Sequence, residues 1–287
     1  MARYAVLTDI HGNLEALEAV LAHADGQRVD AVWCLGDIVV YGPDPDRCLS
    51  RLRQAIGAWP GNVIIGNNDD AVKARIEPDK VLDDWIAQES EVLHLDEKRQ
   101  GYRDATTACH RWTLERLTEE SRELLEKLPK GPCPVLKNAV LVHASPCDPV
   151  GRDGNYLTNT MQAEEAFWCM KEQGYQFCLF GHTHMTTLFR EVTDERPYDN
   201  CEMLRRDRLT GEQVPLGDRR VLINPGSVGQ SRDGDSRAAY VVVDTDEAWV
   251  EFYRVDYAMS ETLRKLKASG LPDAAVRVLC KRLRKAS

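Results

Sequence analysis

Side chains of the types that bind metal ions follow five separate apolar runs of this 287-residue sequence. They are two aspartates, four histidines and one asparagine: Asp9, His11, Asp37, Asn67, His143, His182 and His184. In open α/β sheets the functional crevice lies beyond the carboxyl ends of the strands, so we expect these side chains to meet. Their nitrogen and oxygen donors suit divalent ions such as Mn²⁺, Fe²⁺ or Zn²⁺.

Seven donors are more than one ion needs, but they fit two ions if one carboxylate bridges them. Each residue also has an ordinary alternative: a histidine after a strand can be a hydrogen-bonded structural residue, Asp37 can belong to a turn, and Asn67 can cap a helix. These alternatives would all have to hold together, which favours the metal site. The histidines away from strand ends are expected to be structural, and they are His23, His94 and His110.

The order of the predicted elements indicates the fold. Strands and helices alternate through the first 180 residues, with strands at 4–7, 30–35, 62–65, 139–142 and 177–180 and helices from 14, at 45–55, 79–128 and 159–174. Strands then follow at 188–192, 220–223, 239–244 and 249–255, separated by turn-rich loops at 194–218 and 225–237. This order predicts an α/β fold, a four-layer α-β-β-α sandwich with two mixed sheets.

We expect one domain over residues 1–258, with 79–128 as a helical, cap-like segment within it, followed by a basic helical tail over 259–287. The net charge of −9 argues against bulk binding of nucleic acid. From residue 264 onward, eight Lys and Arg face a single acidic residue, Asp273. That tail is either the solvated face of terminal helices or a docking surface for a partner or a second copy of the chain.

The nine cysteines include no Cys-x-x-Cys pair. Because several lie in apolar stretches, as Cys34, Cys169 and Cys178 do, we expect reduced core residues and a cytoplasmic protein. No run approaches the roughly 20 apolar residues of a membrane span, so no membrane partner is expected. The first strand follows Met1 so closely that no signal peptide is expected.

Five ordered motifs carry a resemblance to a known family. They are Asp9-Ile10-His11, Gly36-Asp37, Gly66-Asn67-x-Asp69, His143 and Gly181-His182-Thr183-His184. Over about residues 3–255 the chain resembles the calcineurin-like metallophosphoesterases. The segments Gly42-Pro43, His143-Ala144-Ser145-Pro146 and Asn224-Pro225-Gly226-Ser227-Val228-Gly229 resemble the small bacterial and archaeal branch described as diadenosine-tetraphosphatase-like or phosphodiesterase-like.

The resemblance implies two divalent ions, with Mn²⁺ expected first and Fe, Zn, Ni or Mg as alternatives. One ion would be held by Asp9, His11, Asp37 and His184, and the other by Asp37, Asn67, His143 and His182. Asp37 would bridge them, and a bridging hydroxide would attack phosphorus in line. The expected substrates are small phosphate-containing molecules.

One position departs from the family pattern. Many members have histidine after the metal-binding asparagine, paired with the following aspartate, but here the pair is Asn68 and Asp69. An amide donates a hydrogen bond but delivers no proton, and general acid catalysis contributes about 10²–10⁴-fold. We therefore expect activated diesters or nucleotide polyphosphates as substrates, unless Asp69, His94, His110 or a metal-bound water serves as the acid.

Four further residues are candidates for contact with substrate. Asn13 can reach a phosphate or cap a helix, and Arg152 lies in a loop that can cover the substrate or be plain surface. Arg232 and Arg237 can meet an anionic substrate or be solvated turn charges. The turn at 224–227 is expected to be structural.

Two other function classes remain open. The fold also serves as a non-catalytic scaffold in relatives that have lost metal-binding residues. The basic tail and the presence of Asn68 in place of histidine leave that function open here. A nuclease is disfavoured by the acidic charge and by the lack of a basic, aromatic-lined groove.

Overall fold

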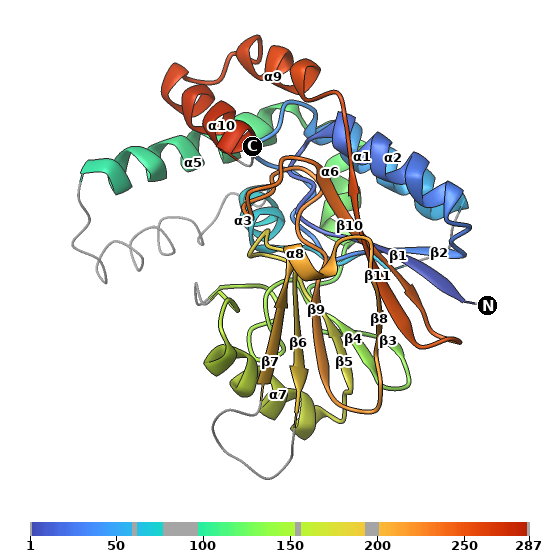
Figure 1. Cartoon of the computed structure of the whole chain (residues 1–287). Coiled ribbons are helices and arrows are strands. Elements are labelled where there is room, and N and C mark those ends of the chain that lie inside the picture. The colour runs from blue at the N-terminus through green and yellow to red at the C-terminus, as the bar shows by residue number, and fades with distance from the viewer. Residues whose placement is uncertain (1, 59–61, 77–96, 153–155, 193–200, 286–287) are drawn as a thin grey trace.

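The computed structural model describes residues 2–58, 62–76, 97–152, 156–192 and 201–285, which form two mixed β-sheets between helices (Figure 1). The first sheet has the order β2-β1-β10-β11-β8. Its strands are β1 (Arg3–Leu7), β2 (Ala31–Cys34), β8 (Gln213–Pro215), β10 (Ala238–Asp244) and β11 (Trp249–Val255). Within it, β1 pairs parallel to β2 and antiparallel to β10.

The second sheet has the order β3-β4-β5-β9-β6-β7. Its strands are β3 (Cys133–Leu136), β4 (Ala139–Leu141), β5 (Phe177–Leu179), β6 (Thr187–Glu191), β7 (Cys201–Arg205) and β9 (Val221–Asn224). Here β4, β5 and β9 run parallel, while β6 pairs antiparallel to β9. Both sheets are therefore mixed, as predicted.

The two sheets pack against each other through alternate residues of their strands, because successive side chains point to opposite faces. Val6, Trp33 and Phe252 of the first sheet share one buried cluster with Leu179 and Ile223 of the second. The residues between them, such as Leu7 and Cys34, face the helices instead. Strands covered on both faces read as continuous apolar runs, which is why the sequence signal was clear.

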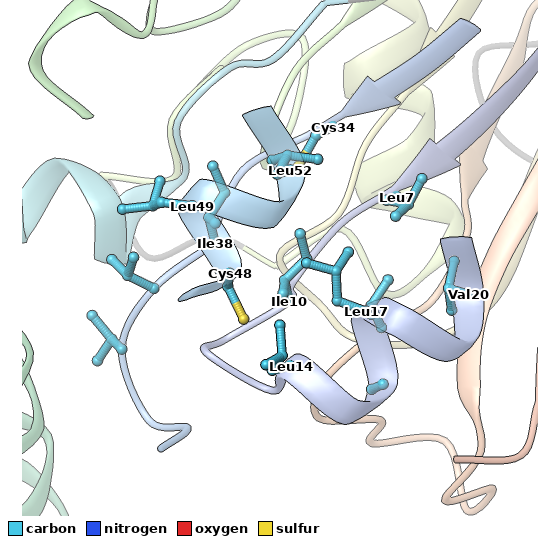
Figure 2. Close-up of a cluster of buried hydrophobic side chains, with 14 of the residues drawn as sticks. Leu7, Ile10, Leu14, Leu17, Val20, Cys34, Ile38, Cys48, Leu49 and Leu52 are labelled. Carbon is cyan, nitrogen blue, oxygen red and sulfur yellow. The ribbon is translucent and has the colours of Figure 1, made fainter. Parts of the chain in front are cut away.

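Helices cover the outer face of each sheet. The first sheet is covered by α1 (Leu14–Gly26) and α2 (Pro45–Ala58), and Figure 2 shows Leu14, Leu17 and Val20 of α1 with Leu49 and Leu52 of α2 in their shared cluster. The second sheet is covered by α7 (Thr160–Gln173), through a cluster that includes Phe167 and Met170. The layers are therefore helix, sheet, sheet and helix, and the predicted fold class is confirmed.

The remaining helices are α3 (Asn67–Ile76), α5 (Glu97–Arg116), α6 (Glu119–Lys127), α8 (Arg206–Leu209), α9 (Met259–Lys267) and α10 (Asp273–Lys285). The predicted helical span 79–128 contains α5 and α6, and its residues 79–96 lie outside the described part. The C-terminal helices do not stand apart: α10 packs on α5, and α9 packs on α1 (Figure 1). Their apolar side chains, Leu266, Leu279 and Leu283 among them, join the helical core.

Two predictions of strands and loops were wrong. The stretch 62–65 is no regular strand, because its one bridge joins Val63 to Cys34, and Ile65 bonds instead to the carbonyl of Pro129. The stretch 194–218 is no plain loop, because it contains β7, α8 and β8. The apolar alternation of Cys201 and Met203, which pack toward the cluster beneath α7, was the missed signal.

The prediction of reduced cysteines was wrong for one pair. Cys147, in the loop after β4, and Cys169, on α7, form a disulfide with their Cα atoms 5.8 Å apart. The pairing depends on how α7 docks against that loop, which cysteine spacing does not encode. Cys34 and Cys178 are free and buried, as expected. Within the described ranges, none of the helices has the length and apolar character needed to cross a bilayer.

Candidate metal centre and active site

The seven predicted ligands meet at one edge of the sandwich, where turns follow β1, β2, β4 and β5 and where α3 begins with Asn67. Five of them have backbone φ angles in the left-handed region, and these are Asp9 (52°), His11 (49°), Asp37 (52°), His182 (65°) and His184 (59°). Non-glycine residues adopt this conformation rarely, and it concentrates at functional sites. The tight turns bring each side chain back toward the same point.

Four of these residues form a first group. Asp9, His11, Asp37 and His184 are buried, and each offers one ligand atom within 4.8 Å of the others. The Oδ1 atom of Asp9 lies 3.2 Å from Nε2 of His184, and the Nε2 atoms of His11 and His184 lie 3.2 Å apart. This group is the set assigned to the first ion from the resemblance.

The other ligands form a second group that shares Asp37. Oδ1 of Asn67 lies 3.1 Å from Nε2 of His143 and 3.0 Å from Nδ1 of His182. Oδ2 of Asp37 lies 3.5 Å from Nε2 of His143 and also 3.5 Å from Nε2 of His11. The Asp37 carboxylate therefore lies between the two groups.

Hydrogen bonds to backbone carbonyls orient three of the imidazoles. Nδ1 of His11 faces the carbonyl of Val39 at 3.3 Å, Nδ1 of His143 faces Leu35 at 2.8 Å, and Nδ1 of His184 faces Gln230 at 2.6 Å. Since a carbonyl only accepts, each Nδ1 carries the proton, and in the neutral ring Nε2 presents a lone pair to the cluster. This carbonyl support is typical of metal-binding histidines.

The donor set fits divalent ions by its chemistry. Lone pairs of imidazole nitrogens face carboxylate and amide oxygens, and acceptors cannot satisfy one another. Oδ1 of Asp9 is buried, and no described residue gives it a well-oriented hydrogen bond. Its other oxygen accepts from the Thr8 hydroxyl and from the backbone N–H of His182, both at 3.0 Å. A divalent cation would satisfy these acceptors together.

Titration of the buried groups indicates the same need for positive charge. Burial lowers the pKa of His11 to about 4 and raises the pKa of Asp9 to about 7. Burial opposes charge on Asp37 and His143 as well, but their mutual attraction prevails. It holds the pKa of Asp37 well below its usual value and raises the pKa of His143 to about 9. A divalent ion would compete with that proton.

Asn68 and Asp69, at the start of α3, hold the turns of the site. The Asn68 side-chain amide donates to Oδ2 of Asp37 at 2.6 Å, and its backbone N–H donates to Oδ1 at 2.9 Å. Asp69 accepts from the backbone N–H groups of Ile38, Val39 and Gly66, between 3.0 and 3.2 Å. Burial raises the pKa of Asp69 to about 7.

The other candidate acids and substrate contacts are placed as follows. His110 is buried on α5, and His94 lies outside the described residues. Asn13 caps α1, accepting from Ala16 N–H at 3.2 Å, while its amide donates to the carbonyl of Gly229 at 2.9 Å. Arg152 is exposed and binds Asp70 through two nitrogens, at 2.6 and 3.1 Å.

The two arginines of the 225–237 loop differ. Arg237 is paired with Asp235 at 2.7 Å, whereas Arg232 has no carboxylate partner among the residues that the structure describes.

The turn at 224–227 is structural, as predicted, since Asn224 donates to the Gly181 carbonyl at 2.8 Å and Ser227 donates to the Asp9 carbonyl at 2.8 Å. It holds two of the ligand-bearing turns together.

Three residues beside the site were missed from the sequence. The Tyr41 ring lies 4.9 Å from the His11 ring, and the Tyr156 ring stacks on His182 at 4.3 Å. Arg282 of α10 lies 5.2 Å from the Tyr41 ring centroid. None of the three belongs to a motif, and Arg282 is more than 200 residues from Tyr41 in sequence. No local pattern in the sequence therefore indicated these contacts.

The fold and the site together define a phosphoesterase of the metal-binding α-β-β-α class. Residues 3–248 match the model of the calcineurin-like phosphoesterase superfamily domain, and the chain belongs to this family. The predicted class of enzyme, a phosphoric ester hydrolase, is thereby confirmed.

Relatives with solved structures share this architecture over the whole chain. A metallophosphoesterase from Sphaerobacter thermophilus is 32% identical, with a TM-score of 0.76, covering 100% of this chain and 99% of its own. A hypothetical protein from Pyrococcus horikoshii OT3 is 23% identical, with a TM-score of 0.70, covering 97% and 98%. The latter likeness concerns the fold alone.

Curated relatives match to different extents. An uncharacterized protein from Methanocaldococcus jannaschii is 28% identical over 94% of this chain and 93% of its own length. A symmetrical bis(5'-nucleosyl)-tetraphosphatase from Shewanella sediminis is 32% identical over 42% of this chain. The chain matches half the length of that enzyme.

Proposed function

We propose that the protein is a dinuclear, metal-dependent phosphoric ester hydrolase that acts on activated phosphodiesters or nucleotide polyphosphates. The observation that carries this proposal is the shared position of Asp37, 3.5 Å from an imidazole nitrogen of each group. Two divalent ions, Mn²⁺ first among the candidates, would supply Lewis acids for the phosphoryl oxygens and lower the pKa of a water molecule. The partial match to a tetraphosphatase supports the polyphosphate class.

The chain's own residues orient the site. Hydrogen bonds from Nδ1 to backbone carbonyls fix His11, His143 and His184 with Nε2 toward the cluster. Asn68 donates two hydrogen bonds to Asp37 and so fixes the carboxylate between the groups. Side chains held in place in this way are already oriented for an ion to bind.

The engagement of Asn68 with Asp37 supports a dependence on good leaving groups. Its amide nitrogen is 2.6 Å from a carboxylate and has no proton to give to an alkoxide. Asn68→His should therefore raise the rate on an unactivated monoester, such as glycerol 2-phosphate, more than on p-nitrophenyl phosphate. Equal effects on both substrates at every pH would contradict this assignment.

The function is tested with metal-stripped protein and added Mn²⁺. The substrates are bis(p-nitrophenyl) phosphate, p-nitrophenyl phosphate and diadenosine tetraphosphate, and Asp37→Asn is the control because it keeps the shape of the side chain. We expect Mn²⁺-dependent turnover that the variant lacks. Two bound ions without turnover of any substrate would instead favour the scaffold function.

We also propose a cytoplasmic location. The seven free cysteines support it, whereas the Cys147–Cys169 disulfide is more typical of an oxidising compartment. Fractionation of cells followed by thiol labelling tests both points. Recovery of the protein outside the cytoplasm would refute the proposal.

A further inference from the structure

A loop of unusual conformation lies beside the first group of ligands. Val40 and Tyr41 have φ angles of 70° and 71°, in the left-handed region that a β-branched residue such as valine strongly avoids. The loop is held by Asp69, which accepts from Val39 N–H at 3.0 Å. Strain that neighbours enforce in this way concentrates at functional sites, and here it places the Tyr41 ring 4.9 Å from His11.

A guanidinium group from the C-terminal helix lies over that ring. Arg282 of α10 is centred 5.2 Å from the Tyr41 ring and donates to Oε1 of Gln230 at 3.2 Å. It is half-buried, whereas its neighbour Lys281 is exposed. The basic tail, expected as a solvated face or a docking surface, thus directs one of its charges toward the ligand cluster.

A second guanidinium contacts the same glutamine. Arg232 donates to Oε1 of Gln230 at 3.4 Å, and its backbone N–H donates to the carbonyl of His184 at 3.1 Å. Its side chain is exposed.

We propose that Arg232 and Arg282 bind a phosphate group of the substrate other than the one that is hydrolysed. They converge on the side chain of Gln230, whose backbone carbonyl accepts from Nδ1 of the predicted ligand His184, so one residue links them to the first group of ligands. A guanidinium group can bind two oxygens of one phosphate at once through parallel hydrogen bonds. Arg232, which is exposed, and Arg282, which is half-buried, thus form an anion-binding rim beside the predicted metal site.

This inference rests on the proposed function and narrows it. A simple diester carries a single phosphate and gains nothing from the rim. A nucleotide polyphosphate carries further phosphates next to the scissile bond, and these would meet Arg232 and Arg282. The rim therefore selects nucleotide polyphosphates over phosphodiesters.

The kinetic test compares two substrates in matched variants. Arg232→Gln and Arg282→Gln should each lower kcat/KM for diadenosine tetraphosphate about 10- to 100-fold, mainly through KM, because each removes a charge-assisted contact. The loss of kcat/KM for bis(p-nitrophenyl) phosphate, which carries a single phosphate, should be at least tenfold smaller in both variants. Lys281→Gln removes an exposed charge from the same helix and should change neither. Equal losses on both substrates, or no loss, would overturn the inference.

A binding measurement separates this inference from the proposed hydrolysis. Inorganic tripolyphosphate is titrated calorimetrically into protein held in chelator, so that no metal contributes. The wild-type protein should bind at least tenfold more tightly than the variant lacking both arginines, and more weakly as salt rises. Equal binding by both proteins overturns the inference even if the enzyme hydrolyses phosphodiesters. Because Arg232 is exposed, its single variant should fold normally, and circular dichroism checks this.

Discussion

Gly66 is the position where one added methyl group should disable the site without removing any ligand. A Cβ atom there would lie 2.2 Å from Oδ1 of Asp37, 2.6 Å from its backbone nitrogen and 2.6 Å from Cε1 of His143. Ordinary non-bonded contacts are about 3.5 Å, so Gly66→Ala must displace Asp37 or His143 by about 1 Å. Gly57 in α2 offers a contrast, since nothing lies within 4 Å of a Cβ atom built there.

The displacement sets the expected magnitudes. Overpacking of a well-packed interior costs about 1–3 kcal/mol, so the melting temperature should fall by about 2–10 °C. A misplacement of about 1 Å at a catalytic centre costs about 10²-fold in rate. Because Asp37 lies between the two groups, Mn²⁺ affinity should fall together with turnover.

The assay measures Mn²⁺ stoichiometry, thermal unfolding and hydrolysis of bis(p-nitrophenyl) phosphate for Gly66→Ala and Gly57→Ala. The control should be stabilised by about 0.4–1 kcal/mol, because alanine restricts the unfolded chain, and should keep full activity. If Gly66→Ala binds Mn²⁺ normally and hydrolyses within threefold of the wild type, the site is not where the convergence of Asp37 and His143 indicates.

Three further predictions concern metal, disulfide and aromatic contacts. Since the pKa of His143 is raised to about 9 in the metal-free protein, an ion must displace its proton below that pH. Apparent Mn²⁺ affinity should thus rise about tenfold per pH unit from pH 7 toward 9, and a flat profile in buffered calorimetry would contradict this. Cys147→Ser should lower the free energy of unfolding in urea by about 3 kcal/mol, because the disulfide closes a loop of 22 residues, and a reductant should affect the wild type alone. Tyr156→Ala should weaken Mn²⁺ binding by exposing the His182 ring that Tyr156 stacks on, whereas Tyr156→Phe should preserve it; identical effects of the two would point to the hydroxyl instead.

The meeting of the seven candidate side chains could be predicted because each of them comes shortly after an apolar run. Leu7 and Cys34 end parallel neighbours, so Asp9 and Asp37 had to emerge at one edge of the sheet. Because active sites lie at the carboxyl ends of strands in such sheets, the order of strands and side chains was enough to predict this convergence, without any distance between the side chains. The spacing of apolar residues in the helices was an equally direct signal, since Leu14, Leu17 and Val20 form the buried face of α1.

The features that were missed depend on tertiary packing. The strand predicted at 62–65 has the right composition, but Ile65 bonds to the Pro129 carbonyl instead of extending a ladder. The disulfide requires α7 to dock against the loop after β4, a contact invisible in the order of residues. Arg282 reaches Tyr41 only because α10 packs on α5.

The backbone of the site explains why its residues and the surrounding fold depend on each other. Five predicted ligands have left-handed φ angles, and each costs on the order of 1–3 kcal/mol. Together this approaches the whole stability of a typical domain, so neighbouring turns must enforce it. Asp9 N–H donates to Gly36, His11 N–H donates to Asp37, and His182 N–H donates to the Asp9 carboxylate, all between 2.9 and 3.0 Å. Each strained turn is therefore held by the next, and a sequence that gains only the side chains, without these turns, would not bring their ligand atoms together.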